Sequence, residues 1–335
     1  MKLIKMFFIP ISFFAFCLQG CNAQPSTQSQ SLTLIASITL PDVNGRIDHL
    51  AFDPYSQRIF VAALGNNSLE VIDLKNNKSI HSIQNLHEPQ GVVYIHESNT
   101  IFVANGNNGV CDVFNATNFQ KITTIQLPGD ADNVRYDSIN KKIYVGYGDG
   151  GIAIIDANTF RQVGDITLQG HPESFQLSIT AKKIFVNVPD KQQVEIIDLD
   201  KQIVIARWKL TAAKSNFPMS LDTTNHRLFV GCRHPAKMLV LDTNTGNLIA
   251  EVGTDSDVDD IFYSQKDGNI YLSCGGGYID IFRQQAPATY KLIEKISSHS
   301  GARTSLLIPQ LNRLIVASPK SFSYNATILV DATKQ

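Results

Sequence analysis

The chain has 335 residues and a formal net charge of −1; 43% of its residues are hydrophobic and 18% are charged. This composition excludes a disordered polar chain, and a charge balance so close to neutral gives no indication of nucleic-acid binding. Its 21 glycines and 13 prolines, without a long helical pattern or a block of like charges, are typical of a globular protein built from strands and turns.

The N-terminal residues have the pattern of an export signal. Lys2 and Lys5 precede an apolar stretch at 7–17, which is too short to span a bilayer. The tetrad Leu-Gln-Gly-Cys at 18–21 looks like a bacterial lipobox. That resemblance implies cleavage before Cys21 and lipidation of its thiol, which would attach the protein to a membrane.

Three segments and a location are expected from this pattern. The segments are a lipoprotein signal peptide at 1–20, the lipidated cysteine and a polar tether at 21–30, and a single domain at 31–335. Asn22, where an aspartate would resemble a retention signal of the inner membrane, favours the outer membrane. The protein is therefore predicted to be a lipoprotein of the bacterial cell envelope that faces the periplasm.

The predicted domain consists of a sevenfold repeat. One aromatic or aliphatic residue inside a short apolar run recurs every 41 to 44 residues, at Phe60, Phe102, Tyr144, Phe185, Phe229, Tyr271 and Ile315. A second apolar run follows and ends in a polar residue, as at Asp73 and Asp156. Short β-branched and aromatic runs at this period predict blades of four strands, so we expect an all-β, seven-bladed β-propeller.

The two ends of the chain are expected to close the ring together. The first unit has four strand-like runs, at 48–53, 58–62, 68–73 and 79–84. The last unit has only three, at 304–309, 313–317 and 326–331. Residues 32–40 match the outer run of the second unit and are predicted to complete the seventh blade, which would remove an exposed sheet edge.

Three cysteines fall inside the predicted domain, at Cys111, Cys232 and Cys274. An odd number excludes complete disulfide pairing. Cys232 and Cys274 occupy equivalent places on neighbouring blades, where Cα atoms seldom come within the roughly 7 Å that a disulfide requires. We therefore expect buried free thiols.

Runs such as Phe102-Val103-Ala104-Asn105 and Tyr144-Val145-Gly146 resemble the YVTN-repeat propellers of the YncE-like family. The resemblance covers essentially the whole predicted domain, and stretches such as Gly301-Ala302-Arg303-Thr304-Ser305 resemble an exported subgroup of that family. It implies a WD40-like propeller and export. It implies no particular chemistry, because propellers include binding modules, lactonases, lyases and redox enzymes.

Polar residues recur at the start of the innermost strand of each unit. Twelve residues before each repeat residue lie Asp48, Gln90, Asp132, Glu173, Phe217, Asp259 and Arg303, and fourteen before lie Arg46, Glu88, Asp130, His171, Ser215, Asp257 and Gly301. In a propeller these positions surround one mouth of the central channel, so an acidic funnel is expected there. The predicted ligand-binding residues are Arg46, Asp48, His49, Gln90, Asp132, Asn133, Glu173, Phe217, Asp259, Arg303 and His234.

Carboxylates gathered in a narrow mouth raise one another's pKa unless a cation compensates them. A divalent cation such as Ca²⁺ could be held by Asp48, Asn133, Glu173 and Asp259, and His49, His171 and Glu173 are the candidates for proton transfer. Two alternatives stay open. The funnel could bind a cationic or polyhydroxylated small molecule anchored by an arginine, or its charges could simply be solvated and paired with one another.

Three functions are consistent with these patterns. The first, which the sequence favours, is a lipid-anchored binding or scaffold module for a small-molecule ligand or an envelope protein. The second is a metal-assisted hydrolase or lyase of lactonase type that uses the carboxylate ring. The third is an accessory subunit of an envelope redox system. The first is favoured because the candidate metal ligands come from a ring of equivalent positions rather than from a recognised motif, and because no residue selects the redox role.

Overall fold

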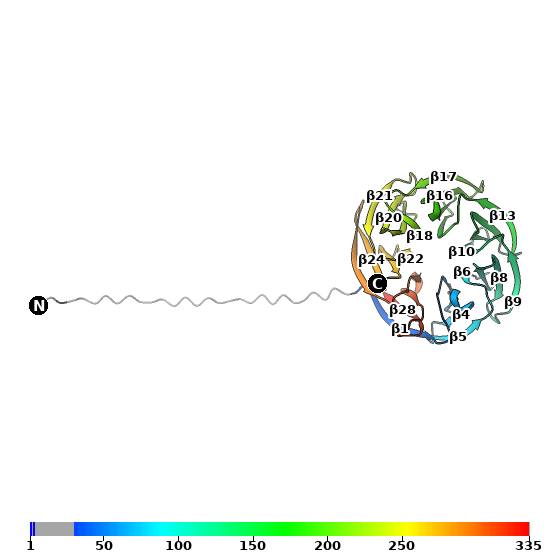
Figure 1. The fold of residues 1–335 in the computed structure, drawn as a ribbon, viewed down its shortest axis with the longest axis horizontal. Helices are drawn as coiled ribbons and strands as arrows, with labels where there is room; N and C mark the ends of the chain where they lie inside the picture. Colours follow the sequence, from blue (N-terminus) through cyan, green and yellow to red (C-terminus); the bar gives the residue numbers. More distant parts are fainter. Residues whose placement is uncertain (2, 4–29, 335) are drawn as a thin grey trace.

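The structure is a computed structural model that describes residues 1, 3 and 30–334. Cys21, most of the predicted signal peptide and most of the tether lie outside the described residues. Residues 30–334 form seven four-stranded antiparallel sheets arranged in a ring, which confirms the predicted seven-bladed propeller (Figure 1). No helix in the described part of the chain is long and apolar enough to cross a membrane.

Each blade runs from an inner strand at the channel to an outer strand at the rim. The first blade contains β2 (Leu50–Asp53), β3 (Arg58–Ala63), β4 (Ser68–Asp73) and β5 (Lys78–Ile83). The second contains β6 (Pro89–Ile95), β7 (Thr100–Asn105), β8 (Val110–Asn115) and β9 (Lys121–Gln126). The third contains β10 (Ala131–Asp137), β11 (Lys142–Tyr147), β12 (Gly151–Asp156) and β13 (Arg161–Thr167).

The next three blades repeat this order. The fourth contains β14 (Phe175–Ser178), β15 (Lys183–Val188), β16 (Gln193–Asp198) and β17 (Ile203–Lys209). The fifth contains β18 (Lys214–Asp222), β19 (Arg227–His234), β20 (Ala236–Asp242) and β21 (Leu248–Gly253). The sixth contains β22 (Val258–Tyr263), β23 (Asn269–Cys274), β24 (Tyr278–Ala286) and β25 (Thr289–Ser297). Three short 3-10 turns follow a strand, at Leu64–Asn66, Pro189–Lys191 and Pro309–Leu311.

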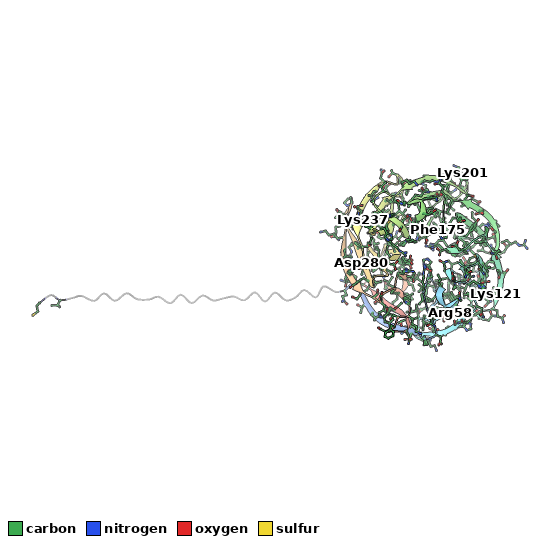
Figure 2. The ribbon with its side chains drawn as sticks, in the orientation of Figure 1. Arg58, Lys121, Phe175, Lys201, Lys237 and Asp280 are labelled. Carbon is green, nitrogen blue, oxygen red and sulfur yellow. The ribbon has the colours of Figure 1, made fainter. Side chains whose placement is uncertain are left out.

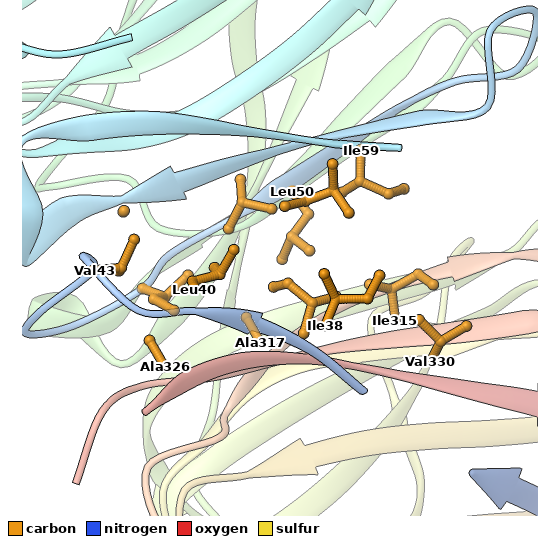
Figure 3. Packing of buried hydrophobic residues seen from close by; sticks show 14 of the residues in the cluster. Ile38, Leu40, Val43, Leu50, Ile59, Ile315, Ala317, Ala326 and Val330 are labelled. Carbon is orange, nitrogen blue, oxygen red and sulfur yellow. The ribbon is translucent and has the colours of Figure 1, made fainter. Parts of the chain in front are cut away.

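The seventh blade joins the two ends of the chain, as predicted. It contains β26 (Thr304–Ile308), β27 (Arg313–Ser318), β28 (Ala326–Thr333) and, outermost, β1 (Leu32–Leu40). The antiparallel register of β1 on β28 runs from Leu32 opposite Thr333 to Leu40 opposite Ala326. Ile38 and Leu40 are buried between the seventh and first blades, in the cluster drawn in Figure 3.

The repeat residues belong to the second strand of each blade, where both sheet faces are covered by neighbouring blades. Every residue of β7 is buried, and its four central residues, 101–104, are a continuous apolar run rather than an alternating one. The outer strand β17, by contrast, alternates exposed and partly buried residues along its whole length. Figure 2 shows the same gradient, with Phe175 on the inner side of the ring and Lys121 and Lys201 at the rim. The core therefore consists of apolar wedges between blades.

The polar residue that ends the third strand of several blades closes the following turn. The carboxylate of Asp242 accepts hydrogen bonds from the backbone N–H groups of Asn244 and Thr245, both at 3.0 Å. Asp73 and Asp156 make the same two contacts in their own blades. These are turns in which an aspartate side chain satisfies backbone donors. The repeated aspartates are thus explained by turn formation.

Candidate functional site

The start of each inner strand places polar side chains around one mouth of the channel. In the third blade, Ala131 pairs with Tyr147 and Val134 pairs with Val145, so the strand is irregular between them. Asp132 and Asn133 lie in this irregular step, and both are buried, at 6% and 2% exposure. A regular strand would point successive side chains to opposite faces. The irregular step therefore lets two adjacent polar residues contribute to the same mouth.

Four charged residues from the fifth and sixth blades and the last inner strand form an ion-pair network beside the mouth. Arg303 contacts both carboxylate oxygens of Asp257, at 2.9 and 3.1 Å, and its Nε lies 3.1 Å from Asp259. Arg233 lies 2.6 Å from Asp259, and its guanidinium stacks 4.0 Å from the ring centre of Phe217. Burial raises the pKa of Asp259 to about 6, while Arg233 and Arg303 oppose that rise. These two aspartates are therefore compensated within the protein.

Asp48 is compensated in a similar way on the other side of the mouth. Its carboxylate lies 2.8 Å from Arg46 and 3.7 Å from His49, which in turn lies 3.7 Å from Asp260. Burial alone would lower the pKa of His49, but Asp48 and Asp260 raise it to about 10. His49 is thus an imidazolium at neutral pH and has no free lone pair with which to accept a proton. This geometry does not support His49 as a general base.

Asp132 and Glu173 form no ion pair with any described residue. Burial raises the pKa of Asp132 to about 6, and the neighbouring Asp48 adds to the rise. Burial also raises the pKa of Glu173 well above its usual value, and the nearby charge of Asp132 raises it further. Ionising two adjacent carboxyl groups in a desolvated environment costs free energy unless a positive charge pairs with them. We call these two residues the acid pair.

His171 completes a trio with the acid pair. One ligand atom each from Asp132, His171 and Glu173 lie within 4.8 Å of one another, a spacing that suits a metal ion. The Nδ1 of His171 lies 2.7 Å from the carbonyl oxygen of Gly148, so Nδ1 carries the proton and donates it. When the imidazole is neutral, its Nε2 is therefore the nitrogen with a free lone pair.

A small cavity of about 20 Å³ opens at the same place. Its walls include Asp132, Asn133 and Glu173, together with Arg46, Asp48, His49, Ser174, Phe217 and Asp259. A space of this size holds one water molecule or one ion. The Oδ1 atom of Asn133 is buried with no hydrogen-bond partner in the described structure. An unpaired amide oxygen beside two desolvated carboxylates is a suitable environment for a bound cation.

The remaining predicted site residues are placed differently. Arg303 belongs to the ion-pair network and does not line the small cavity, and Gln90 lies against Gly106 instead. His234 is exposed, with its Nδ1 3.0 Å from Ser215 Oγ, and it lines neither the small cavity nor the larger one below it. Of the predicted metal ligands, Glu173 belongs to the trio and Asn133 lines the small cavity. Asp48 and Asp259 are engaged by arginines instead, and the trio adds Asp132 and His171.

Below the mouth lies a larger cavity of about 410 Å³ that all seven inner strands line. It shares His49 and Ser174 with the small cavity, so the two spaces adjoin one another. Arg135 and Asp260 line it, and neither was among the residues predicted from the sequence. The signal was available in the repeat, because Arg135 lies nine residues before Tyr144, where other units carry uncharged residues.

Comparisons with known proteins establish the fold. No family model matches the sequence, and no curated protein matches it. A chain in the crystal structure of a mitotic checkpoint complex aligns with a TM-score of 0.76 and 14% identity, covering 96% of this chain and 99% of that chain. A chain of hydrazine synthase from Kuenenia stuttgartiensis aligns with a TM-score of 0.73 and 15% identity, covering 87% of this chain and 96% of that chain. At such identities the likeness concerns the propeller alone, a fold that hosts unrelated functions.

Proposed function

We propose that the protein is a binding module of the cell envelope, similar to the YVTN-repeat propellers, that takes a cation at the mouth of its channel. The carrying observation is the acid pair, Asp132 and Glu173, which forms no ion pair with a described residue and lines a cavity of about 20 Å³. Lipidation of Cys21 would hold this module near the outer membrane through a short tether.

The donor set favours a divalent metal ion over an organic cation. Two carboxylates, an imidazole nitrogen and the unpaired oxygen of Asn133 are hard and borderline ligands of the kind that Mn²⁺ or Zn²⁺ accepts. Ca²⁺ prefers oxygen ligands alone, which makes the imidazole a poor fit for it. A space that holds one water molecule leaves no room for an alkylammonium group.

The first test is elemental analysis of a chain that begins at residue 30, followed by titration of the chelated protein with Mn²⁺, Zn²⁺, Ca²⁺ and methylammonium. We expect one equivalent of a transition metal and a higher thermal midpoint when it binds. The double variant Asp132→Asn with Glu173→Gln should lose this shift, whereas Asp149→Asn, on an exposed loop, should keep it. A folded wild-type protein whose midpoint responds to none of the four cations would refute the proposal.

A second candidate function is a metal-assisted hydrolase or lyase. It is favoured by the same trio, because an ion held by three protein ligands retains a position for water or a substrate carbonyl. Chelation should then abolish turnover of a simple lactone, and the bound metal should restore it. Metal binding without any lactone turnover would leave the binding module as the function.

A further inference from the structure

One ring of side chains in the channel contains a single charged member. The residues paired directly opposite the repeat residues line the large cavity, and they are Ala51, Val93, Arg135, Gln176, Ser220, Phe262 and Leu306. Six of the seven are uncharged, which is the ordinary choice for a desolvated channel. Arg135 departs from that choice.

The guanidinium of Arg135 has only neutral partners. It donates to the carbonyl of Val134 at 2.9 Å and to Ser174 Oγ at 3.4 Å, and it lies 5.5 Å from the ring centre of Phe175. No carboxylate of the described residues forms an ion pair with it. An arginine remains charged even where burial disfavours the charge, so the channel holds a cation that is only partly satisfied.

The carboxylate of Asp260 lines the same cavity as Arg135, but it already has other partners. It accepts the backbone N–H of Ser305 at 2.8 Å and lies 3.7 Å from the imidazolium of His49. Arg46 pairs with Asp48, and Arg233 and Arg303 pair with Asp259. Asp132 attracts the charge of Arg135 but forms no ion pair with it. Arg135 is therefore left with its charge available to a ligand.

The remaining walls define the shape of that ligand. Phe262, Tyr94 and Tyr136 are aromatic, and Val93 and Leu306 are aliphatic, while Gln176 adds an amide. A cavity of about 410 Å³ lies within the range of sites for small organic molecules. A planar guanidinium matches a carboxylate through two parallel hydrogen bonds, and aromatic walls favour a flat apolar body.

We propose that the channel binds a small organic carboxylate, with its carboxylate on Arg135 and its apolar body among the aromatic and aliphatic walls. The carboxylate site includes neither Asp132 nor Glu173. Its test is therefore separate from the test of the cation site at the mouth.

The test is calorimetric titration of the chain that begins at residue 30 with benzoate, and with benzyl alcohol as the neutral probe of similar shape. Benzoate should bind once per chain with a Kd of about 1 mM or tighter, and benzyl alcohol should not bind measurably. Arg135→Gln should weaken benzoate at least tenfold, while Arg161→Gln, an exposed arginine of β13, should not change it.

The thermal midpoint of the ligand-free protein separates ligand binding by Arg135 from a purely structural role, in which its loss would lower the midpoint. Because the substitution removes a partly buried charge that has no ion pair with a described residue, Arg135→Gln should leave the thermal midpoint of the ligand-free protein unchanged or higher. Val93→Phe narrows the channel without replacing Arg135 and should also abolish benzoate binding. This variant tests the proposal if Arg135→Gln does not fold. Absence of saturable benzoate binding, or full binding by Arg135→Gln, would overturn the proposal.

Discussion

The acid pair shows how the partners of a buried carboxylate decide its behaviour in this mouth. Asp48 and Asp259 have the same side chain as Asp132, yet each forms an ion pair with an arginine, whereas Asp132 forms none with a described residue. The consequence for stability follows from proton linkage. A carboxyl whose pKa is higher in the folded chain binds its proton more tightly there, so its contribution to stability is lost as pH rises through that pKa.

We predict that, in metal-free protein, Asp132→Asn and Glu173→Gln each raise stability at pH 8 by roughly 1 to 2 kcal/mol. At pH 4 the variants should equal the wild type, because Asp132, with a pKa of about 6, is already protonated there. Urea unfolding at the two pH values measures the difference, with Asp149→Asn as the control. A variant that is less stable at pH 8 would show that the ionised pair is needed to hold the mouth together.

At the scale of the strand and its turn, the aspartate that ends a third strand makes a pH-dependent contribution of opposite sign. Burial would raise the pKa of Asp242, but the N–H groups of Thr245 and Asn244 lower it below its usual value. Its contribution is therefore present above about pH 4 and is lost as pH falls. Asp242→Ala should cost about 1 kcal/mol at pH 7 and nothing near pH 2.

Chemical unfolding across this pH range tests the turn, with the exposed Asp42→Ala as the matched control. An equal loss at both extremes of pH would mean that Asp242 acts by packing rather than through its charge.

The strand β1 is the element on which ring closure depends. Its Ile38 is 2% exposed and packs in the cluster between the seventh and first blades, so Ile38→Asp would bury an unpaired charge. We predict a loss of several kcal/mol, enough to abolish cooperative unfolding in many domains of this stability. Ile35→Asp, at an exposed position of the same strand, should change little.

Deletion of the strand tests closure directly. A chain that begins at residue 42 leaves β28 with an unpaired edge and should aggregate. A peptide of residues 30–41 added in trans should restore a soluble monomer. A monomeric, cooperatively folded deletion variant without the peptide would contradict this role for β1.

At the scale of the whole molecule, the three buried cysteines report whether the ring opens as one unit. Cys111, Cys232 and Cys274 lie in the second, fifth and sixth blades, and all are free and buried, as predicted. Burial raises the pKa of the Cys232 thiol to about 12, so the folded chain presents almost no thiolate. In chains that begin at residue 30 and keep one of the three, labelling by a thiol reagent should occur at a single common rate.

That rate should match the rate of global unfolding measured by fluorescence. Three different rates would show instead that blades open one by one, as in open repeat arrays.

The sequence was sufficient for the architecture because the fold is repetitive. Each blade repeats the apolar run around residues such as Phe102, so seven weak signals reinforce one another, and the missing outer strand of the last unit pointed to β1. The gathering of polar residues at one mouth of the channel could be predicted for the same reason. The pairing of charges could not, because sequence register carries no information on which arginine reaches which carboxylate.

Two residues illustrate that limit. Arg233 and His234 are adjacent on β19, and successive side chains of a strand point to opposite faces, so only one of them could face the mouth. The structure shows that Arg233 does, through Asp259 and Phe217. Arg135 was missed because counting stopped at the start of the inner strands, whereas the channel continues below them.

The register of β1 on β28 has one further consequence. Leu32 and Thr333 are direct partners, so the start of β1 and the end of β28 lie side by side in the seventh blade (Figure 1). A short linker of glycine and serine could join them, and new termini could be cut between any two blades. Such circularly permuted chains should fold to the same disc, which would make the native point of closure one of seven interchangeable choices.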